Sequence, residues 1–162
     1  MGKMLIIWII LGTLLALFLF NYYCCERQVQ CEDVSHNERY AHLIGQKYKS
    51  IKELSIHGIL APEDYNKKEQ EIAYYTITEK PGIGGRYVIS RNYLKNNTLM
   101  QVKKVSHCEY LFDPNIVLEI AISSEEKYSD HSVEIGGPQI EIIKYKNNEA
   151  NINPELFEPV PD

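Results

Sequence analysis

Hydrophobic residues are distributed along this chain in two different ways. Residues 4–20, MLIIWIILGTLLALFLF, carry no charge, and such a run is apolar on every side of a helix. After residue 25 the apolar stretches are short and many alternate with polar residues, the period of two that is typical of strands. The pattern therefore predicts an N-terminal apolar helix followed by a β-rich region.

The uncharged run has the length of a membrane-spanning helix. As a helix it would measure about 25 Å. Tyr22 and Tyr23 follow it, and aromatic rings of this kind favour the headgroup region of a bilayer. We therefore expect residues 1–25 to form a single-pass membrane anchor that contacts the lipid bilayer through residues 4–23.

Two other interpretations of this segment are less favoured. A cleaved secretory signal would need small residues just before the cut, and the sequence offers none between Ala16 and Cys25. A bacterial lipoprotein site needs a small residue before the modified cysteine, but Tyr23 precedes Cys24. The expected anchor is therefore an uncleaved signal-anchor.

The charges on either side of the run predict its orientation. Lys3 precedes it, whereas Glu26, Glu32 and Asp33 are among the residues that follow it. Because positive charge favours the cytoplasmic side, we expect a cytoplasmic N-terminus. The C-terminal domain would then lie outside, in the periplasm if the protein is bacterial.

The rest of the chain is expected to hold one small domain. Residues 26–39 are polar and predict a tether, residues 40–147 predict a β-rich domain, and residues 148–162 predict an acidic, proline-containing tail. Within the domain, about six or seven short strands are separated by turn residues. Residues 71–80 have apolar positions on both faces, as a central strand does. This pattern favours a mainly β fold, either a small antiparallel barrel of the SH3-like or OB-like kind or a compact sandwich.

The net charge narrows the class of partner. The chain has a formal charge of −5, and residues 1–25 contain one basic residue and no acidic one, so the domain is more acidic than the whole. A surface of this sign repels phosphate backbones, and general nucleic-acid binding is not expected. It would suit a basic protein partner, as an immunity-type inhibitor that caps an effector would need.

The four cysteines fall into two groups. Cys31 and Cys108 are the natural disulfide pair in an oxidising compartment. Cys24 and Cys25 adjoin the apolar run and are candidates for acylation or for a disulfide between two copies of the chain. His107 is next to Cys108, but neighbours along a strand point to opposite faces, so a thiol–imidazole pair is not expected there.

A basic and aromatic segment is the first candidate for a binding face. The glycines in PGIGG at residues 81–85 precede a strand-like run and lack the residues of a phosphate loop, so a turn or bulge is expected. Cations and tyrosines then follow close together, and paired strands could present them to an anionic partner. The sequence favours a solvated strand face for these residues, and they are the first candidate if the domain has a binding face. The candidate residues are Arg86, Tyr87, Arg91, Tyr93, Lys95, Lys103 and Lys104.

No catalytic, cofactor-binding or metal-binding residue is predicted. The five histidines show no metal-ligand spacing, and Glu125 and Glu126 lie in a polar stretch that would not raise a carboxyl pKa. We therefore expect a membrane-anchored binding module that holds a protein partner, an immunity-type inhibitor or an envelope assembly component. The alternatives are a small hydrolase or thiol enzyme and a structural homo-oligomeric subunit; the sequence does not fix the oligomeric state.

Overall fold

A computed structural model describes Trp8 and residues 11–15, 30–67, 69–109, 114–123, 126–137 and 140–161. The chain divides into two units, Met1–Gln30 and Cys31–Asp162. In the first unit Trp8 and residues 11–15 are helical and exposed.

The expected membrane-spanning helix is not supported. Within the described residues no helix is long and apolar enough to cross a membrane, which overturns the prediction for residues 4–20 and the single-pass location inferred from it. That prediction used the hydropathy and length of the run and its flanking tyrosines, and the described part of it, Trp8 and residues 11–15, is much shorter than the roughly 20 residues that a spanning helix needs. The other residues of the proposed anchor lie outside those the structure describes.

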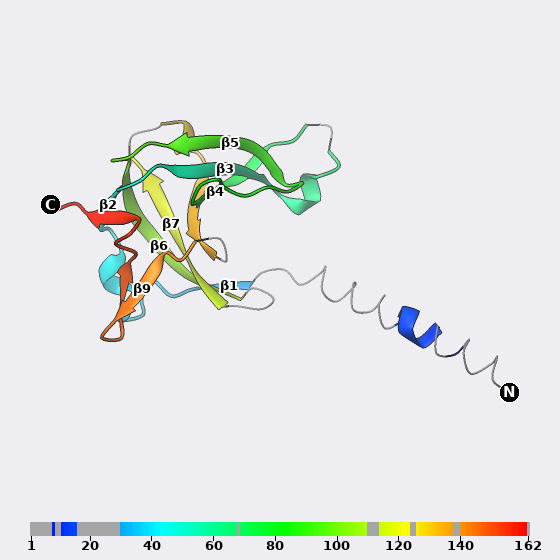
Figure 1. Cartoon of the computed structure of the whole chain (residues 1–162), viewed down its shortest axis with the longest axis horizontal. Coiled ribbons are helices and arrows are strands. Elements are labelled where there is room, and N and C mark those ends of the chain that lie inside the picture. The colour runs from blue at the N-terminus through cyan, green and yellow to red at the C-terminus, as the bar shows by residue number, and fades with distance from the viewer. Residues whose placement is uncertain are drawn as a thin grey trace. The chain divides into compact units, whose positions relative to one another are not determined.

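The second unit is mainly β, as its alternating pattern predicts (Figure 1). Short 3-10 turns lie between some of its strands. The elements are β1 (Gln30–Asp33), η1 (Ala41–Leu43), β2 (Lys47–Ser50), β3 (Leu54–Leu60), η2 (Pro62–Asp64), β4 (Ile72–Thr78), β5 (Val88–Leu94), β6 (Leu99–Glu109), β7 (Pro114–Ile122), η3 (Glu126–Tyr128), β8 (Ser132–Gly136), β9 (Ile143–Lys146), β10 (Glu149–Ile152) and β11 (Phe157–Pro159).

Nine of these strands form one sheet. The strand order is β11-β2-β6-β7-β8-β4-β3-β5, and β1 also pairs with β6. β9 and β10 form a separate hairpin, whose turn residues Asn147 and Asn148 both have positive φ, as a tight hairpin turn requires. β10 and β11 lie within residues 148–162, the segment expected to be a tail, and their buried residues Ala150 and Phe157 join the core.

The expected fully antiparallel barrel or sandwich is also wrong in one respect. β4 and β8 pair in parallel, with Thr76 opposite Glu134. The chain between them makes β5, β6 and β7 before it returns, so β8 arrives beside β4 by a long connection rather than by a hairpin. Short strands at regular spacing suggest hairpins, and they contain no signal for such a return.

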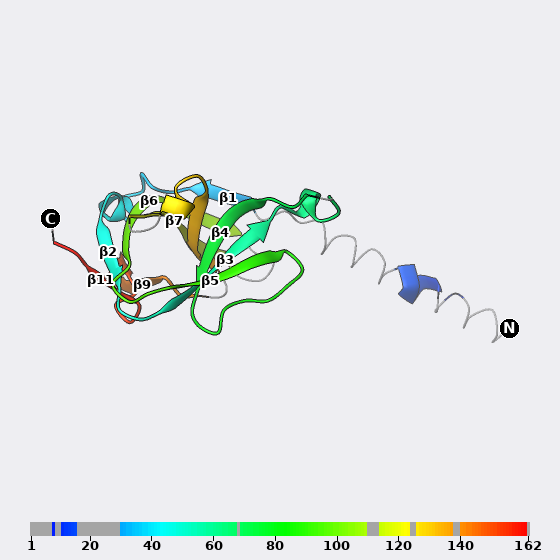
Figure 2. The ribbon, with the colours of Figure 1, turned by 90° about the horizontal axis from the view of Figure 1, so that it is seen from above.

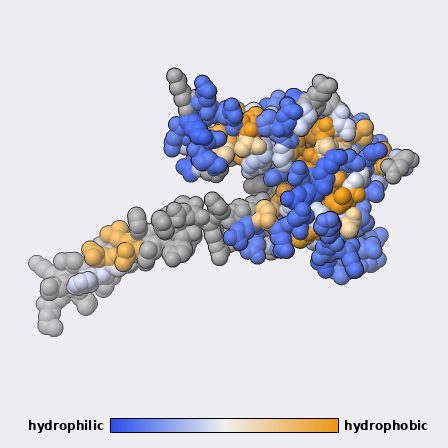
Figure 3. Space-filling view, turned by 180° about the vertical axis from the view of Figure 1, so that it is seen from behind, coloured by the Kyte–Doolittle hydropathy of each residue, from blue (hydrophilic) through white to orange (hydrophobic). Residues whose placement is uncertain are grey.

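The core lies against one face of the sheet. Apolar residues at alternate positions of the strands, such as Ile56, Ile77, Leu118 and Ile135, are at most 2% exposed. Residues from β9, β10 and the chain around β11 complete the cluster. The opposite face carries the polar residues of the same strands. Figure 3 shows one side of the molecule, where hydrophilic residues surround smaller apolar patches.

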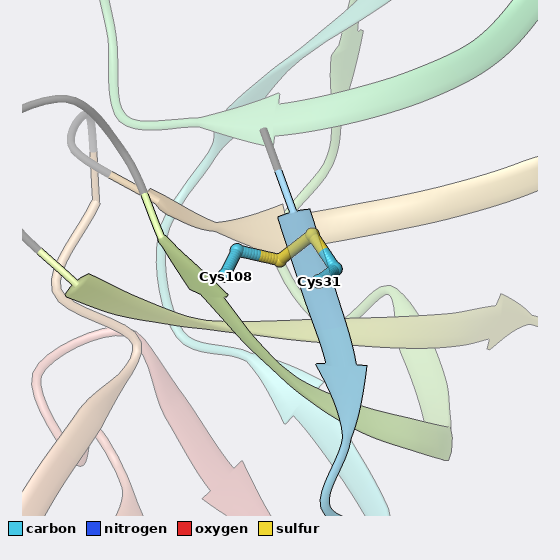
Figure 4. The surroundings of a disulfide bond; sticks show 2 residues. All are labelled: Cys31 and Cys108. Carbon is cyan, nitrogen blue, oxygen red and sulfur yellow. A yellow bond between two sulfur atoms is a disulfide. The ribbon is translucent and has the colours of Figure 1, made fainter. Parts of the chain in front are cut away.

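The expected disulfide is present. Cys31 of β1 and Cys108 of β6 are joined, with an Sγ–Sγ distance of 2.06 Å (Figure 4). The bond links residues that are 77 positions apart in the sequence. It fastens β1, which pairs only with β6 among the described strands, to the longest strand of the sheet.

Candidate binding site along strand β5

The site begins with an unusual connection between β4 and β5. Both strands are antiparallel to β3, which lies between them, so β4 and β5 run in the same direction. The connecting residues 79–87 must therefore return along the length of β3 (Figure 2). Sequence analysis expected a turn or bulge at the glycines of this segment; in the structure they belong to a crossover loop.

Gly82 brings this crossover loop close to β3. Its φ is +92°, a conformation that favours glycine. A Cβ at this position would lie 2.5 Å from Nε2 of His57 and 3.1 Å from Cβ of Ser55. Contact this close requires the absence of a side chain, so Gly82 allows the loop to cover the polar face of β3. All seven residues of β3 are buried, Leu54 and Ile56 in the core and Ser55 and His57 next to Gly82.

The loop covers a layer of polar side chains. Ser55, His57 and Thr78 are only 1%, 1% and 2% exposed. The backbone N–H of Ile83 donates a hydrogen bond to Nε2 of His57 at 3.3 Å, and the hydroxyl of Thr78 lies 3.3 Å from the same nitrogen. Because Nε2 accepts, the proton of the neutral ring is on Nδ1. Neither that nitrogen nor the Ser55 hydroxyl has a hydrogen-bond partner among the described residues.

His57 is held in its neutral form. Burial lowers the pKa of its imidazole, and the nearby positive charge of Arg91 lowers it further. Arg91 is opposite His57 in the β3–β5 ladder, so the two side chains share a face of the sheet. A proton on Nε2 would remove the acceptor used by Ile83, and the neutral ring therefore supports the position of the loop.

The exposed residues of β5 lie beside this polar layer. Tyr93 is opposite Ser55 and is 59% exposed. Nζ of Lys80, from the crossover loop, lies 4.5 Å from the centre of its ring, and the same ammonium pairs with Glu53 at 2.7 Å. Arg91 is also exposed, and Nη2 of its guanidinium lies 3.5 Å from where a Cβ of Gly84 would be.

An aromatic cluster lies just before β5. The guanidinium of Arg86 is 5.4 Å from the ring centre of Tyr65 and 4.8 Å from that of Tyr87. The two rings meet edge to face with their centres 5.5 Å apart. Tyr65 comes from the loop between β3 and β4, so this cluster joins two loops that are distant in sequence.

The described chain contains both paired and unpaired cations, and both kinds occur near β5. Lys49 pairs with Glu158, Lys52 with Glu79 and Lys144 with Glu141. Within the described part of the chain, Arg86, Arg91 and Lys95 form no ion pair with a carboxylate. Together with the neighbouring lysine and aromatic rings they define the β5 surface, which consists of Tyr65, Lys80, Arg86, Tyr87, Arg91, Tyr93 and Lys95.

The structure does not bring the remaining two candidates to this surface. Lys103 and Lys104 are on β6, and β7, β8, β4 and β3 separate β6 from β5 in the sheet. Lys104 is 3.9 Å from Asp33. Lys103 occupies an irregularity of the β6–β7 ladder and donates a hydrogen bond to Gln101. β5 and β6 are consecutive along the chain, but β5 pairs with β3.

Sequence reasoning missed the residues that lie under the loop. Ser55 and His57 alternate with Leu54 and Ile56, which is the ordinary pattern of a strand with one solvated face. Only the crossover loop makes these polar residues buried. Glycines at 82, 84 and 85 were the available signal, since glycine permits a backbone to approach another strand closely.

The hypotheses based on cysteine chemistry have different outcomes. The sulfur of Cys108 is bonded to Cys31, so it is not a free thiolate while that bond exists. Cys24 and Cys25, proposed for acylation or an intermolecular bond, lie outside the described residues.

A pair of glutamates lies farther along the polar face. Glu119 of β7 is opposite Glu134 of β8. Burial raises the pKa of the Glu134 carboxyl, the charge of Glu119 raises it further, and Lys104 partly offsets the shift. The two carboxylates therefore repel each other across the β7–β8 ladder. Among the described residues no group of three or more potential metal ligands comes together.

The hollow in the core is small, whereas open hollows of about 430 Å³ and 540 Å³ lie at the surface, the latter lined by Lys52, Glu53, Lys95 and Asn96. A cavity of about 20 Å³ in the core is lined by apolar residues that include Tyr48, Leu118 and Phe157. It could hold about one water molecule by volume, but it offers that molecule no polar partner.

The hydroxyl of Thr78 and the ring of His57 form a contact that resembles a nucleophile–base pair, but both are covered by the loop.

Comparison with known proteins does not assign the chain to a family. No protein-family model matches it, and neither a curated protein nor a solved structure is similar enough to count as a relative. Function must therefore be argued from the β5 surface itself.

Proposed function

We propose that the protein is a binding module that holds a protein partner on its β5 surface. The observation that carries this proposal is the gathering of unpaired cations and exposed aromatic rings at one margin of an acidic protein. Arginine and tyrosine are enriched among the residues that dominate protein interfaces. Cations without carboxylate partners are available for an anionic group on the partner.

The rest of the protein makes this surface selective. The overall charge of −5 repels acidic molecules in general, whereas the cations near β5 attract an acidic group locally. Complementary charge of this kind guides the orientation of an encounter and rejects unsuitable partners. A compact acidic motif on a protein fits this arrangement better than a long polyanion, which would extend beyond the basic margin.

Crosslinking on the full-length chain in native extract tests the proposal. A lysine-reactive reagent should join one dominant partner through Lys80 or Lys95, and mass spectrometry would identify the linked residues. The double variant Arg86→Glu with Arg91→Glu keeps both lysines and should reduce these crosslinks at least about tenfold. The matched control, Lys103→Glu with Lys146→Glu, makes the same change in charge away from the site and should retain them. Equal crosslinking in both variants, or links spread over other lysines, would contradict the proposal.

A further inference from the structure

β5 is a free edge of the sheet. It pairs with β3 along one side, and no described strand pairs with its other side. Residues 91–93 are exposed. The unpaired side of an edge strand presents backbone N–H and C=O groups that can pair with another extended chain.

The two ends of the sheet are protected differently. β11, at the other end, has only three residues and ends in Pro159, whose backbone has no N–H to donate. Short length and proline are common ways to prevent a strand from pairing. β5 is seven residues long and contains no proline, so its backbone can support a longer ladder.

Charge disfavours a second copy of this chain as the occupant of this edge. Arg91 is the central residue of Val88–Leu94. Two copies of β5 that paired antiparallel over their full length would place Arg91 opposite Arg91. Like charges directly opposite each other destabilise a pair of strands, whereas a carboxylate at that position would be attracted.

We propose that an extended acidic segment of a protein partner adds to the sheet as a strand alongside β5. This inference rests on the proposed function, because it specifies how the β5 surface holds its partner. Arg91 and Tyr93 are two residues apart and share one face of the strand. A carboxylate on the added strand pairs with Arg91, and the residue two positions away packs on the ring of Tyr93. The expected partner motif is therefore an acidic residue with a ring-packing residue two positions away from it.

Selection from a displayed library of random ten-residue peptides on the full-length chain provides the probe. The selected peptides should be enriched in an acidic residue that has an apolar or aromatic residue two positions away. Arg91→Ala should weaken binding of the best peptide at least tenfold, whereas Lys104→Ala, the matched control on β6, should leave its Kd within twofold. Failure to select any peptide, or selection of peptides without this enrichment, overturns strand addition.

Backbone methylation of the selected peptide separates strand addition from simple attraction between charges. In a strand, successive N–H groups point to opposite sides. Methylating the amides of one parity should weaken binding at least tenfold, and methylating the other parity should change it little. If the two methylated peptides bind equally well, strand addition is wrong. The proposed function depends separately on the crosslinking of the Arg86→Glu, Arg91→Glu variant and can stand when strand addition fails.

Discussion

Two equally buried regions of the sheet have opposite energetics. On the core face, Val105, Leu118 and Ile135 are at most 2% exposed and surrounded by apolar residues. Under the crossover loop, Ser55 and His57 are each 1% exposed, yet the Ser55 hydroxyl and Nδ1 of His57 lack hydrogen-bond partners among the described residues. Burial of apolar surface stabilises a fold, whereas burial of an unpartnered polar group costs free energy.

This difference in polarity indicates what each region contributes to the stability of the fold. The core face supplies the free energy of folding. The unpartnered groups of the polar layer lower the free energy of unfolding. The layer is buried because β4 and β5 run in the same direction on either side of β3, so residues 79–87 must cross β3.

The largest loss of stability should come from a substitution on the core face. Leu118→Ala removes a buried side chain beside an existing cavity and should lower the free energy of unfolding by about 2–5 kcal/mol. Urea denaturation measures this directly. Tyr93→Ala, on the exposed side of β5, should change stability by no more than about 0.5 kcal/mol. Similar losses in the two variants would contradict the assignment of stability to the core.

Loss of the disulfide should lower the free energy of unfolding nearly as much as Leu118→Ala. Cys31→Ser and Cys108→Ser should each cost about 2–4 kcal/mol, because the bond restricts a long loop of the unfolded chain. Cys108→Ser should lose somewhat more, because Cys108 is 1% exposed and a hydroxyl would be buried there, whereas Cys31 is exposed. Neither variant should respond further to a reducing agent, and a further loss on reduction would contradict the role of this bond.

The contact between the loop and β3 should have an intermediate effect. Gly82→Ala combines a positive φ with a Cβ pressed against His57 and should cost about 1–3 kcal/mol. Gly84→Ala is the matched control, since its Cβ would meet only Arg91, at 3.5 Å. Thermal unfolding of the two variants should separate them clearly. Equal stability would mean that the loop does not rest on His57.

The polar layer should also make stability depend on pH. The folded-state pKa of His57 is lowered by burial and by Arg91, so the unfolded chain binds a proton more readily. Stability should be complete above the unfolded pKa of about 6.5 and should fall as the pH drops through the folded pKa. His57→Gln should flatten this decline in denaturation experiments between pH 7 and pH 5. Leu118→Ala should be less stable at every pH but keep the decline, and loss of the decline in Leu118→Ala would contradict this account.

The smallest change in stability should come from Glu134→Gln, and this change should be a gain rather than a loss. Burial and Glu119 raise the folded-state pKa of its carboxyl, so its charge opposes folding at neutral pH, and this cost is relieved as the pH falls through the folded pKa. Glu134→Gln should raise stability at pH 7 by about 0.2–1 kcal/mol, the range of a like-charge strand pair. Glu158→Gln, in an exposed pair with Lys49, should give no gain. A loss in Glu134→Gln would show that the carboxylate has a favourable partner.

Sequence patterns predicted the strands with strong periodicity. The segment expected to be a central strand because both of its faces are apolar is β4, which lies between β3 and β8. The strands β1, β10 and β11 were missed. Their sequences QCED, EANI and FEP are short and largely polar, so their pairing is decided by the disulfide, by the turn at Asn147 and by contacts with residues far away in the chain.

Part of the candidate site could also be predicted from local residue patterns. Arg86, Arg91 and Tyr93 stand out as a basic and aromatic segment in an acidic chain. The lysines of β6 were grouped with them because consecutive strands often pair. That expectation fails here, since the edge of β3 accepts β5. Which strand is the neighbour of another depends on tertiary packing, and local residue patterns do not record it.

The position of β2 has a consequence for how the chain reaches its native state. β2 lies between β6 and β11, with Lys47 opposite Gln101 and Ser50 opposite Phe157. During synthesis these pairings cannot be completed until residues 157–159 have left the ribosome, long after β2 itself has emerged. Sheets built from such distant partners fold on timescales of roughly milliseconds to seconds. The unpaired early strands would need protection from aggregation during that interval.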